Sequence, residues 1–226
     1  MFGSVHRWPP ASLLGSLPPA LRTRLLSLGF EIGKDPDSVL MHEGEQTRHA
    51  FLLVSGYVRV TGTTEAGRVA LLAIRGAGDL IGELAALDGR PRSATITAAS
   101  SLIARVIRHD VLHGFMTGHP EAAVAISSAI GAKLRSATRS RIDLSGAPAH
   151  LRVARVLREL ADSHGIPGPG ETVELALSQP DLAALTGTSK PRVEAVLREL
   201  RQEEILATGY RRIVILDPAR LAKRAQ

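Results

Sequence analysis

Short apolar runs separated by glycines fill the chain between Phe30 and Val111. The runs are rich in valine, isoleucine and threonine, which fit the pleated surface of a β-sheet. Short strands with turn residues at regular intervals are typical of antiparallel rolls and sandwiches. We therefore predict a sandwich or roll of antiparallel strands, with strands in residues 38–42, 51–60, 69–74 and 94–106. A short helix should precede it, since three leucines between residues 20 and 28 have helical spacing and Gly29 ends the pattern.

The pattern changes after His119-Pro120, where glycines become rare and the apolar spacing becomes helical as far as Leu144. Alternating steps of four and three residues produce one narrow stripe, the spacing of a coiled-coil seam. The stripe consists of Ile130, Leu134, Ala137, Arg141 and Leu144. The alternative is a helix that packs on its own domain, but so narrow a stripe favours a partner helix. We expect two copies to pair here and to diverge near the charged arginine.

Beyond a joint at Ser145–Pro148, the pattern indicates a second domain built from helices and a hairpin. Apolar residues between 153 and 160 form one helical face, and a strand over 172–177 follows a turn cluster at 165–170. Residues 178–200 are typical of two helices interrupted at Gly187, and residues 205–216 of a hairpin that turns at Gly209. We expect three parts: the helix and β-roll in 1–119, the pairing helix in 120–145, and this last domain in 146–226.

Composition narrows the classes of protein that fit. The 226 residues are 44% hydrophobic, enough for packed cores, and the net charge of +6 favours a polyanionic partner. With no cysteine, disulfides, thiolate metal sites and a cysteine nucleophile are excluded. Prolines interrupt the first 19 residues, and no apolar run is long enough for a signal sequence or a membrane span. We expect a soluble, cytoplasmic protein without a membrane partner.

The clearest candidate chemistry lies between Gly78 and Ile96. The pattern there is a strand end, a glycine turn that begins a short helix at Glu83, a loop, and a strand that opens with Arg92. Main-chain N–H groups at a helix start attract anions, and one arginine fork neutralises a phosphate through two hydrogen bonds. A carboxylate would repel that phosphate, so Glu83 has to bind another group, such as a sugar hydroxyl. The alternative is a surface arginine and a glutamate that complements the helix dipole.

The order of these residues resembles the phosphate-binding cassette of cyclic-nucleotide-binding domains, with Gly-Glu-Leu-Ala at 82–85 and Arg-Ser-Ala-Thr at 92–95. The resemblance implies that Glu83 holds the ribose 2′-hydroxyl and that Arg92 and Ser93 hold the cyclic phosphate, assisted by the neighbouring backbone. The full set implied on this segment is Gly82, Glu83, Leu84, Ala85, Arg92, Ser93 and Ala94.

The same resemblance implies that the long helix recognises the base. Cyclic-AMP-binding regulators carry a Thr-Ser pair where this chain has Ala137 and Thr138, and Lys133 matches a basic residue in the preceding turn. One hydroxyl is therefore missing, and losing one hydrogen bond costs about 0.5–1.5 kcal/mol, up to about tenfold in affinity. Ser93 suits cyclic AMP, whereas a threonine would suggest cyclic GMP. We expect cyclic AMP as the effector and no tightly bound cofactor.

Residues 178–200 have the spacing of a helix-turn-helix. Ser178 can cap the first helix and Ser189 the second, each with a proline in the first turn. The apolar positions Leu182, Leu185, Val193, Val196, Leu197 and Leu200 form a shared core, which leaves an exposed face of Lys190, Pro191, Arg192, Glu194, Ala195, Arg198 and Arg201. In this motif the start of the second helix meets base edges in the major groove. The alternative is a helical hairpin with a solvated charged face.

Arg211 and Arg212 beside the predicted turn add a basic wing, and the whole segment resembles the DNA-binding domain of the Crp/Fnr family. With the cassette, the resemblance covers roughly residues 15–218. It implies an α+β fold: an N-terminal antiparallel β-roll of the cyclic-nucleotide-binding type, a long dimerisation helix and a C-terminal winged helix-turn-helix. It also implies a homodimer that binds a pseudo-palindromic operator in double-stranded DNA, with RNA polymerase as a further partner. The implied DNA-binding residues are Ser178, Gln179, Ser189, Lys190, Pro191, Arg192, Glu194, Arg198, Arg211 and Arg212.

The recognition helix departs from the cyclic-AMP-binding members of the family. Lys190 stands where they carry a guanine-reading arginine, Pro191 replaces a glutamate and Ala195 replaces a second arginine. A lysine still donates to guanine O6 and N7, but the cytosine-reading carboxylate is missing unless Glu194 substitutes for it. The operator sequence of those relatives is therefore not transferred.

The sequence gives little support to an enzyme. His109 and His113 are spaced as two metal ligands on a helix, but neither the glutamate of a His-Glu-x-x-His motif nor a third ligand is near, so we expect a surface pair and no metal site. The sequence has no nucleophile elbow, phosphate-binding loop or paired carboxylates. The alternatives that stay open are a family member that binds DNA without a ligand, one that responds to cyclic GMP or cyclic di-GMP, and a nucleotide-sensing regulatory subunit without DNA binding.

Overall fold

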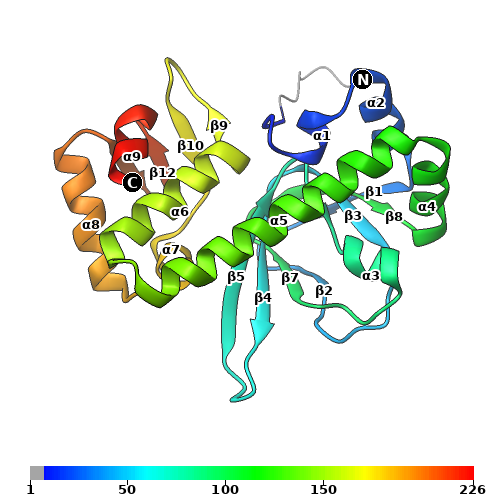
Figure 1. Ribbon diagram of the computed structural model, residues 1–226, viewed down its shortest axis with the longest axis horizontal. Coiled ribbons are helices and arrows are strands. Elements are labelled where there is room, and N and C mark those ends of the chain that lie inside the picture. The colour runs from blue at the N-terminus through cyan, green and yellow to red at the C-terminus, as the bar shows by residue number, and fades with distance from the viewer. Residues whose placement is uncertain (1–7) are drawn as a thin grey trace. The chain divides into compact units, whose positions relative to one another are not determined.

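The computed structural model describes residues 8–226, and the chain divides into two compact units, 1–132 and 133–226. The division falls inside the longest helix, α5 (Pro120–Gly146), which is drawn in green in Figure 1. The predicted α+β fold class is confirmed, with strands dominating the first unit and a helix-turn-helix in the second. The three-part functional division into 1–119, 120–145 and 146–226 stays a prediction.

Residues 8–132 fold into two antiparallel four-stranded sheets that pack as a β-roll (Figure 1). One sheet has the strand order β1-β8-β3-β6, and the other has the order β2-β7-β4-β5. The strands are β1 (Phe30–Lys34), β2 (Val39–Met41), β3 (Ala50–Ser55), β4 (Tyr57–Thr63), β5 (Val69–Gly76), β6 (Leu80–Ile81), β7 (Thr95–Ala98) and β8 (Leu102–Ile107). The predicted roll is confirmed, although residues 51–60 and 94–106 each contain two strands, because the chain turns at Gly56 and at residues 99–101.

Strand β3 is apolar along most of its length because both of its faces are buried. Leu53 faces the interior of the roll, where it clusters with Val58 and Ile96 from the second sheet. Leu52 faces the other way, into a second core that contains Leu112. A strand covered on both sides has no solvent face, so its sequence lacks the polar alternation of a half-buried strand.

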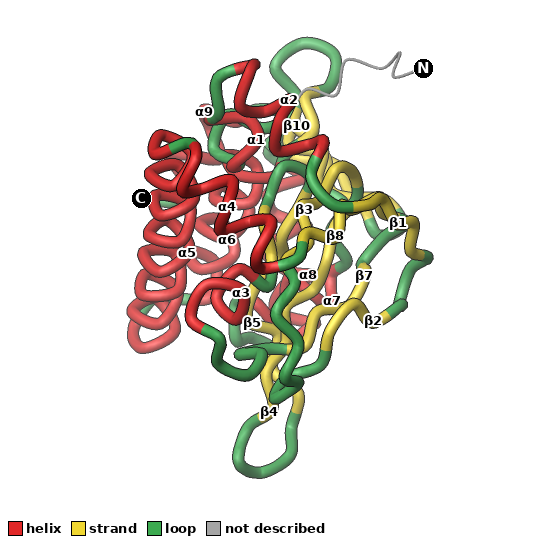
Figure 2. Tube along the Cα trace, turned by 90° about the vertical axis from the view of Figure 1, so that its right-hand side faces the viewer, coloured by secondary structure: helices red, strands yellow, loops and turns green. Residues whose placement is uncertain are grey.

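Helices cover the outer face of the first sheet (Figure 2). They are α1 (Leu13–Ser16), α2 (Pro19–Ser27), α4 (His109–Gly118) and the first turns of α5, while α3 (Glu83–Asp88) follows β6 directly. The predicted helix over residues 20–28 corresponds to α2. The apolar spacing did not predict α1, α4 or β1, which are short elements at the edge of this core.

The second unit contains the predicted helix-turn-helix beside a small antiparallel sheet of order β11-β12-β10-β9. Its elements after α5 are α6 (Ala149–His164), β9 (Ile166–Pro167), β10 (Val173–Leu175), α7 (Gln179–Leu185), α8 (Lys190–Gln202), β11 (Leu206–Gly209), β12 (Arg212–Ile215) and α9 (Pro218–Arg224). The predicted shared core is confirmed for Leu182, Val193, Val196, Leu197 and Leu200, which are all at most 5% exposed. Leu185 is only half-buried.

Two local predictions in this unit are wrong. The hairpin turns at Tyr210 and Arg211 instead of at Gly209, because Gly209 pairs with Arg212 across the two strands. Ser189 stands at the N-cap position of α8, but within residues 8–226 its hydroxyl accepts no capping hydrogen bond. Ser178 does cap α7, since its hydroxyl accepts from the main-chain N–H of Asp181 at 3.2 Å.

Helix α5 packs on its own chain along a stripe next to the predicted seam. Ala122 and Ile126 are buried in the first unit, and Ser136 and Asp143 contact α6 in the second. The predicted seam begins with Ile130, which packs partly against the first unit's core. From there on the seam residues Leu134, Ala137, Arg141 and Leu144 are exposed, Leu134 by 67%. Packing within each unit therefore leaves most of the seam uncovered.

Candidate functional site

Arg92 is the centre of the candidate ligand site. Its side chain lies almost fully inside the first unit, with 3% of the residue exposed. Nε donates to Thr47 Oγ1 at 3.0 Å, Nη1 to the carbonyl of Gly82 at 2.9 Å and Nη2 to the carbonyl of His49 at 2.7 Å. Burial lowers the pKa of Arg92, and the charges of Glu45 and Glu83 oppose that effect. The guanidinium is therefore held in one plane by three separate segments of the chain.

Gly82 has to be glycine for two reasons. It is the N-cap of α3 with a left-handed backbone (φ 70°), which residues with a side chain rarely adopt. In addition, a Cβ at this position would lie 2.7 Å from Arg92 Nη1 and 2.6 Å from Met41 Cε. The missing side chain lets the Gly82 carbonyl approach Arg92, so the glycine turn and the buried arginine form one local structure.

The other predicted cassette residues lie around Gly82 and Arg92, and they differ in how deeply they are buried. Glu83 and Ala85 in α3 are buried, with 7% and 3% exposed, and Ala94 is 9% exposed. Leu84 and Ser93 point to the surface. Gly82, Glu83 and Arg92 thus converge on one place, and Ser93 follows on its exposed side.

Sequence reasoning missed the loop from His42 to His49, which supplies two of the three acceptors for Arg92. Glu45 closes this loop, because its carboxylate accepts from the main-chain N–H of His42 at 3.0 Å, an interaction that lowers the pKa of Glu45. The sequence signal was the turn His42-Glu43-Gly44-Glu45, but nothing in it indicated a contact with residue 92.

The ring of His49 lies beside the same site. It stacks edge-on against Phe51, with a distance of 4.8 Å between ring centroids. Burial lowers the pKa of His49, and the nearby charge of Arg92 lowers it further. His49 therefore favours its neutral form beside the buried guanidinium.

The predicted base-contacting residues lie on the part of α5 that belongs to the second unit. Ala137 and Thr138 are exposed there, and Lys133 is half-buried. Their role towards a nucleotide stays a prediction.

The candidate DNA-binding face follows the start of α8, which lies along one edge of its unit (Figure 1). Lys190, Pro191, Arg192 and Arg198 are exposed as predicted, and Glu194 and Ala195 are half-buried. Lys190 Nζ lies 3.7 Å from Glu194 Oε1, an exposed pair one helical turn apart. At the start of α7, Gln179 is half-buried and the Ser178 hydroxyl serves the helix cap.

The tip of the wing differs from the expected one. Arg212 makes an ion pair with Glu174 of β10 at 2.6 Å, so its charge is directed along the sheet. Tyr210 is 92% exposed, and Arg211 beside it has a left-handed backbone (φ 50°). The hairpin therefore presents an aromatic ring and one arginine at its end, and sequence reasoning had not included Tyr210.

Two arginines of α6 join the end of α5 to the helix-turn-helix. Arg152 donates to the carbonyls of Ala147 and Thr186, both at 2.8 Å, and Arg155 makes an ion pair with Asp143. The glycine of the turn is also in contact with α5, since a Cβ on Gly187 would lie 2.5 Å from Leu144 Cδ2. The last turns of α5 are thus fixed to the DNA-binding fold of the second unit.

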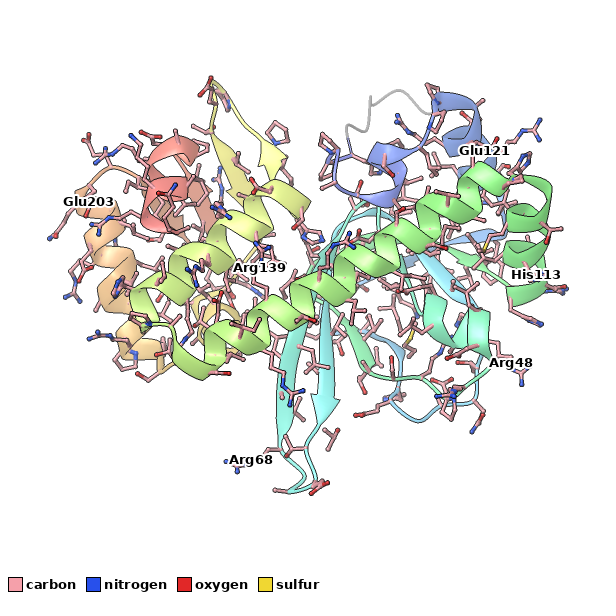
Figure 3. The ribbon with its side chains drawn as sticks, viewed as in Figure 1. Arg48, Arg68, His113, Glu121, Arg139 and Glu203 are labelled. Carbon is pink, nitrogen blue, oxygen red and sulfur yellow. The ribbon has the colours of Figure 1, made fainter. Side chains whose placement is uncertain are left out.

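The histidine pair that the sequence offered as metal ligands, His109 and His113, lies on α4. Within residues 8–226, no three or more histidine, aspartate or glutamate side chains are grouped so that they could hold a metal ion. His113, labelled in Figure 3, points outward from α4. In the same part of the chain, none of the helices is both long enough and apolar enough to cross a membrane.

The fold and both sites define a class of protein that joins a ligand-binding β-roll to a DNA-binding domain. Residues 34–119 match the model of the cyclic nucleotide-binding domain, and residues 151–224 match the Crp-like helix-turn-helix domain. The chain belongs to the Crp/Fnr family of DNA-binding transcriptional regulators.

Known regulators of this family are similar over most of their length. A CRP-like cAMP-activated global transcriptional regulator of Mycobacterium tuberculosis is 29% identical over 185 residues, which cover 81% of this chain and 83% of the relative. The transcriptional regulator LdrP of Thermus thermophilus is 28% identical, covering 80% and 90% of the two chains. These relatives are regulators and not enzymes.

Solved structures share the fold. FixK2 from Bradyrhizobium japonicum superimposes with a TM-score of 0.75 at 23% identity, covering 88% of this chain and 98% of that one. A transcriptional regulator of the CRP family from Thermus thermophilus, TTHB099, has a TM-score of 0.67 at 25% identity, with 86% and 96% covered.

Proposed function

We propose that this regulator is a homodimer whose affinity for a pseudo-palindromic operator is controlled by a cyclic nucleotide, with cyclic AMP as the first candidate. The observation that carries the proposal is the buried, fixed Arg92 beside Glu83. Cyclic GMP and cyclic di-GMP are the alternative effectors. RNA polymerase as a partner and a cytoplasmic location belong to the same proposal.

Arg92 fits the role of anion ligand because its orientation is set in advance. Within residues 8–226, three of its five N–H groups have protein acceptors, which leaves one N–H on each terminal nitrogen. A guanidinium that is already oriented loses little side-chain entropy when it meets a phosphate. The adjacent carboxylate of Glu83 suits a sugar hydroxyl, as the cassette resemblance implies.

The proposed dimer uses the exposed seam of α5. Leu134 is 67% exposed in the single chain, and burying such side chains against an identical helix is favourable by about 25 cal/mol per Å² of apolar surface. Two copies would also place two recognition helices on one operator. A two-fold dimer then engages two half-sites about one or a few helical turns apart.

Contact with DNA is assigned to the basic face of α8. Lys190 and Arg192 lie at the start of α8, the part of a recognition helix that contacts base edges in this motif. Arg198 adds a further positive charge on the same exposed face. The ion pair of Lys190 with Glu194 is weak enough for DNA to replace it, because an exposed pair of this kind contributes only about 0.3–0.5 kcal/mol.

One experiment tests effector control directly. Calorimetric titration of the purified protein with cyclic AMP, cyclic GMP and cyclic di-GMP identifies the ligand, and a gel-shift with mixed genomic fragments is then run with and without it. We expect one nucleotide to bind and to tighten DNA binding, by a factor that corresponds to about 1–3 kcal/mol of coupling. Binding of DNA with no nucleotide binding at all would contradict effector control but not the DNA-binding function.

A second candidate is a regulator that binds DNA independently of any nucleotide. The observation in its favour is that Arg92 is hydrogen-bonded to its own chain at all three nitrogens, so the site keeps its structure without a ligand. Reciprocity separates the two functions, because coupled ligands change each other's affinity by the same factor. Equal nucleotide affinity with and without saturating operator DNA would favour this second candidate.

A further inference from the structure

The loop from His42 to His49 packs directly on the segment that carries Arg92, just before β7. The main-chain N–H of Arg92 donates to the carbonyl of Glu45 at 2.9 Å, and the N–H of Gly44 donates to the carbonyl of Arg92 at 2.8 Å. These two bonds fix the loop at the height of the arginine. The loop is therefore a third wall of the site, beside α3 and β7.

Thr47 is the one side chain among the three described acceptors of Arg92. Its Oγ1 accepts from Nε at 3.0 Å, whereas the other two acceptors are the main-chain carbonyls of Gly82 and His49. Nε is the nitrogen nearest the aliphatic chain, so its bond direction determines how the planar guanidinium is rotated. A threonine hydroxyl at this place controls where the remaining N–H groups point.

Glu45 holds the loop that carries Thr47. Its carboxylate accepts from the main-chain N–H of His42 at 3.0 Å, and its carbonyl accepts from the N–H of Arg92 at 2.9 Å. The charge of Glu45 also raises the pKa of Arg92, against the larger effect of burial. Glu45 therefore acts on Arg92 through the loop and through its charge, and Thr47 acts through its direct hydrogen bond.

We propose that Glu45 and Thr47 are positioning residues that orient Arg92 for the phosphate of the nucleotide. The proposal rests on the proposed function, in which Arg92 binds that phosphate. Without the Thr47 hydroxyl, the buried Nε–H has lost its acceptor, and the guanidinium has to rotate or leave its place to find another. The neighbouring fork would then meet the phosphate at a poorer angle.

Calorimetric titration with cyclic AMP tests this through matched variants. Thr47→Val keeps the shape and removes the hydroxyl, and we expect cyclic AMP to bind about tenfold or more weakly, as for a lost hydrogen bond to a charged group. Thr47→Ser restores the hydroxyl and should bind within about threefold of the unaltered protein. Thr117→Val is the control, because that hydroxyl donates to the carbonyl of His113 on the exposed side of α4, away from Arg92. Glu45→Gln keeps an acceptor without charge and should fall between the serine and valine variants. Equal affinity in Thr47→Val and the unaltered protein overturns the proposal.

A measurement without ligand tests the positioning of Arg92 by Thr47 separately from nucleotide binding. The Nε–H of Arg92, assigned by its absence in Arg92→Lys, should exchange slowly with water in a nitrogen-15 NMR spectrum and quickly in Thr47→Val. Slow exchange in both proteins overturns the positioning role, whatever the ligand. If the unaltered protein binds no cyclic nucleotide but the valine variant shows fast exchange, the proposed function fails and the positioning role of Thr47 stands.

Discussion

Arg92→Ala should destabilise the first unit as well as remove ligand binding. The substitution deletes three charge-assisted hydrogen bonds, at 3.0, 2.9 and 2.7 Å, and leaves a void where a residue with 3% exposure had been. Each such bond contributes about 1.5–3 kcal/mol, but removing the guanidinium also removes the cost of burying a charge, which the lowered pKa of Arg92 reflects. We therefore expect a net loss of about 2–4 kcal/mol in the free energy of unfolding of this unit.

The chain offers a local probe for that measurement. Trp8 is its single tryptophan, and the indole Nε1 donates to the carbonyl of Val54 in β3 at 3.1 Å. Tryptophan fluorescence during urea unfolding therefore reports on the first unit. With a slope of about 2 kcal/mol per molar urea, the midpoint should fall by about 1–2 M.

A matched substitution controls for the general effect of losing an arginine. Arg90→Ala changes a neighbouring exposed side chain and should leave the midpoint within the change of about 0.5 kcal/mol that is usual for surface positions. The same midpoint for Arg92→Ala and Arg90→Ala would refute the reasoning, because Arg92 would then contribute nothing through its three bonds.

Three further predictions address the dimer, the wing and the pH dependence. Leu134→Asp puts a charge on the exposed seam of α5 and should yield monomers with weaker DNA affinity, as measured by light scattering and gel-shift; a persisting dimer would locate the interface elsewhere. Arg211→Gly should raise the free energy of unfolding of the second unit by about 1 kcal/mol, since glycine tolerates the positive φ. The same change should weaken binding to all DNA sequences and flatten the salt dependence of that binding. The ring of His49 should titrate below its usual pKa of 6.5 in an NMR titration, and closer to that value in Arg92→Ala. Because the unfolded chain binds the proton more readily, His49 should cost stability as pH falls through 6.5 towards its lowered pKa, and His49→Gln should reduce that loss.

The sequence predicted best those features that depend on neighbouring residues. The helix-turn-helix follows from a capping serine, a glycine and an apolar face within 23 residues, and its core residues Leu182 and Leu197 are both buried as expected. The cassette is equally local, since Gly82 and Arg92 are separated by a single short helix and loop. Periodicity and local chemistry are sufficient in such cases because the interacting residues are close along the chain.

Features that depend on distant pairing were missed. Thr47 and Arg92 are 45 residues apart, and their contact arises from the order of strands in the roll, which a local pattern does not contain. The misplaced hairpin turn has a similar cause. Glycine is favoured in turns, but the register between Leu206 and Ile215 fixes a two-residue connection and places Gly209 in the strand.

The contacts between α5 and α6 are a third feature that the sequence pattern did not predict. Two stripes run along this helix, and the seam of Leu134 and Ala137 lies next to the stripe of Ser136 and Asp143 that packs on α6. Because the second stripe is mostly small or polar, the apolar spacing did not reveal it. Its contacts become visible only when the partners on α6 are known.

The arginines of α6 determine where a separately expressed DNA-binding fragment has to begin. A fragment that starts at α6 itself would lack Ala147 and Asp143, the partners of Arg152 and Arg155. It would also lack Ser136, which is hydrogen-bonded to Glu159. Arg152 would keep Thr186 and Arg155 would keep Ala225, but neither arginine would still hold the preceding helix. A fragment that begins a turn or more before Ser136 keeps every one of these contacts, so it should retain the native spacing between the helix-turn-helix and the helix that leads into it.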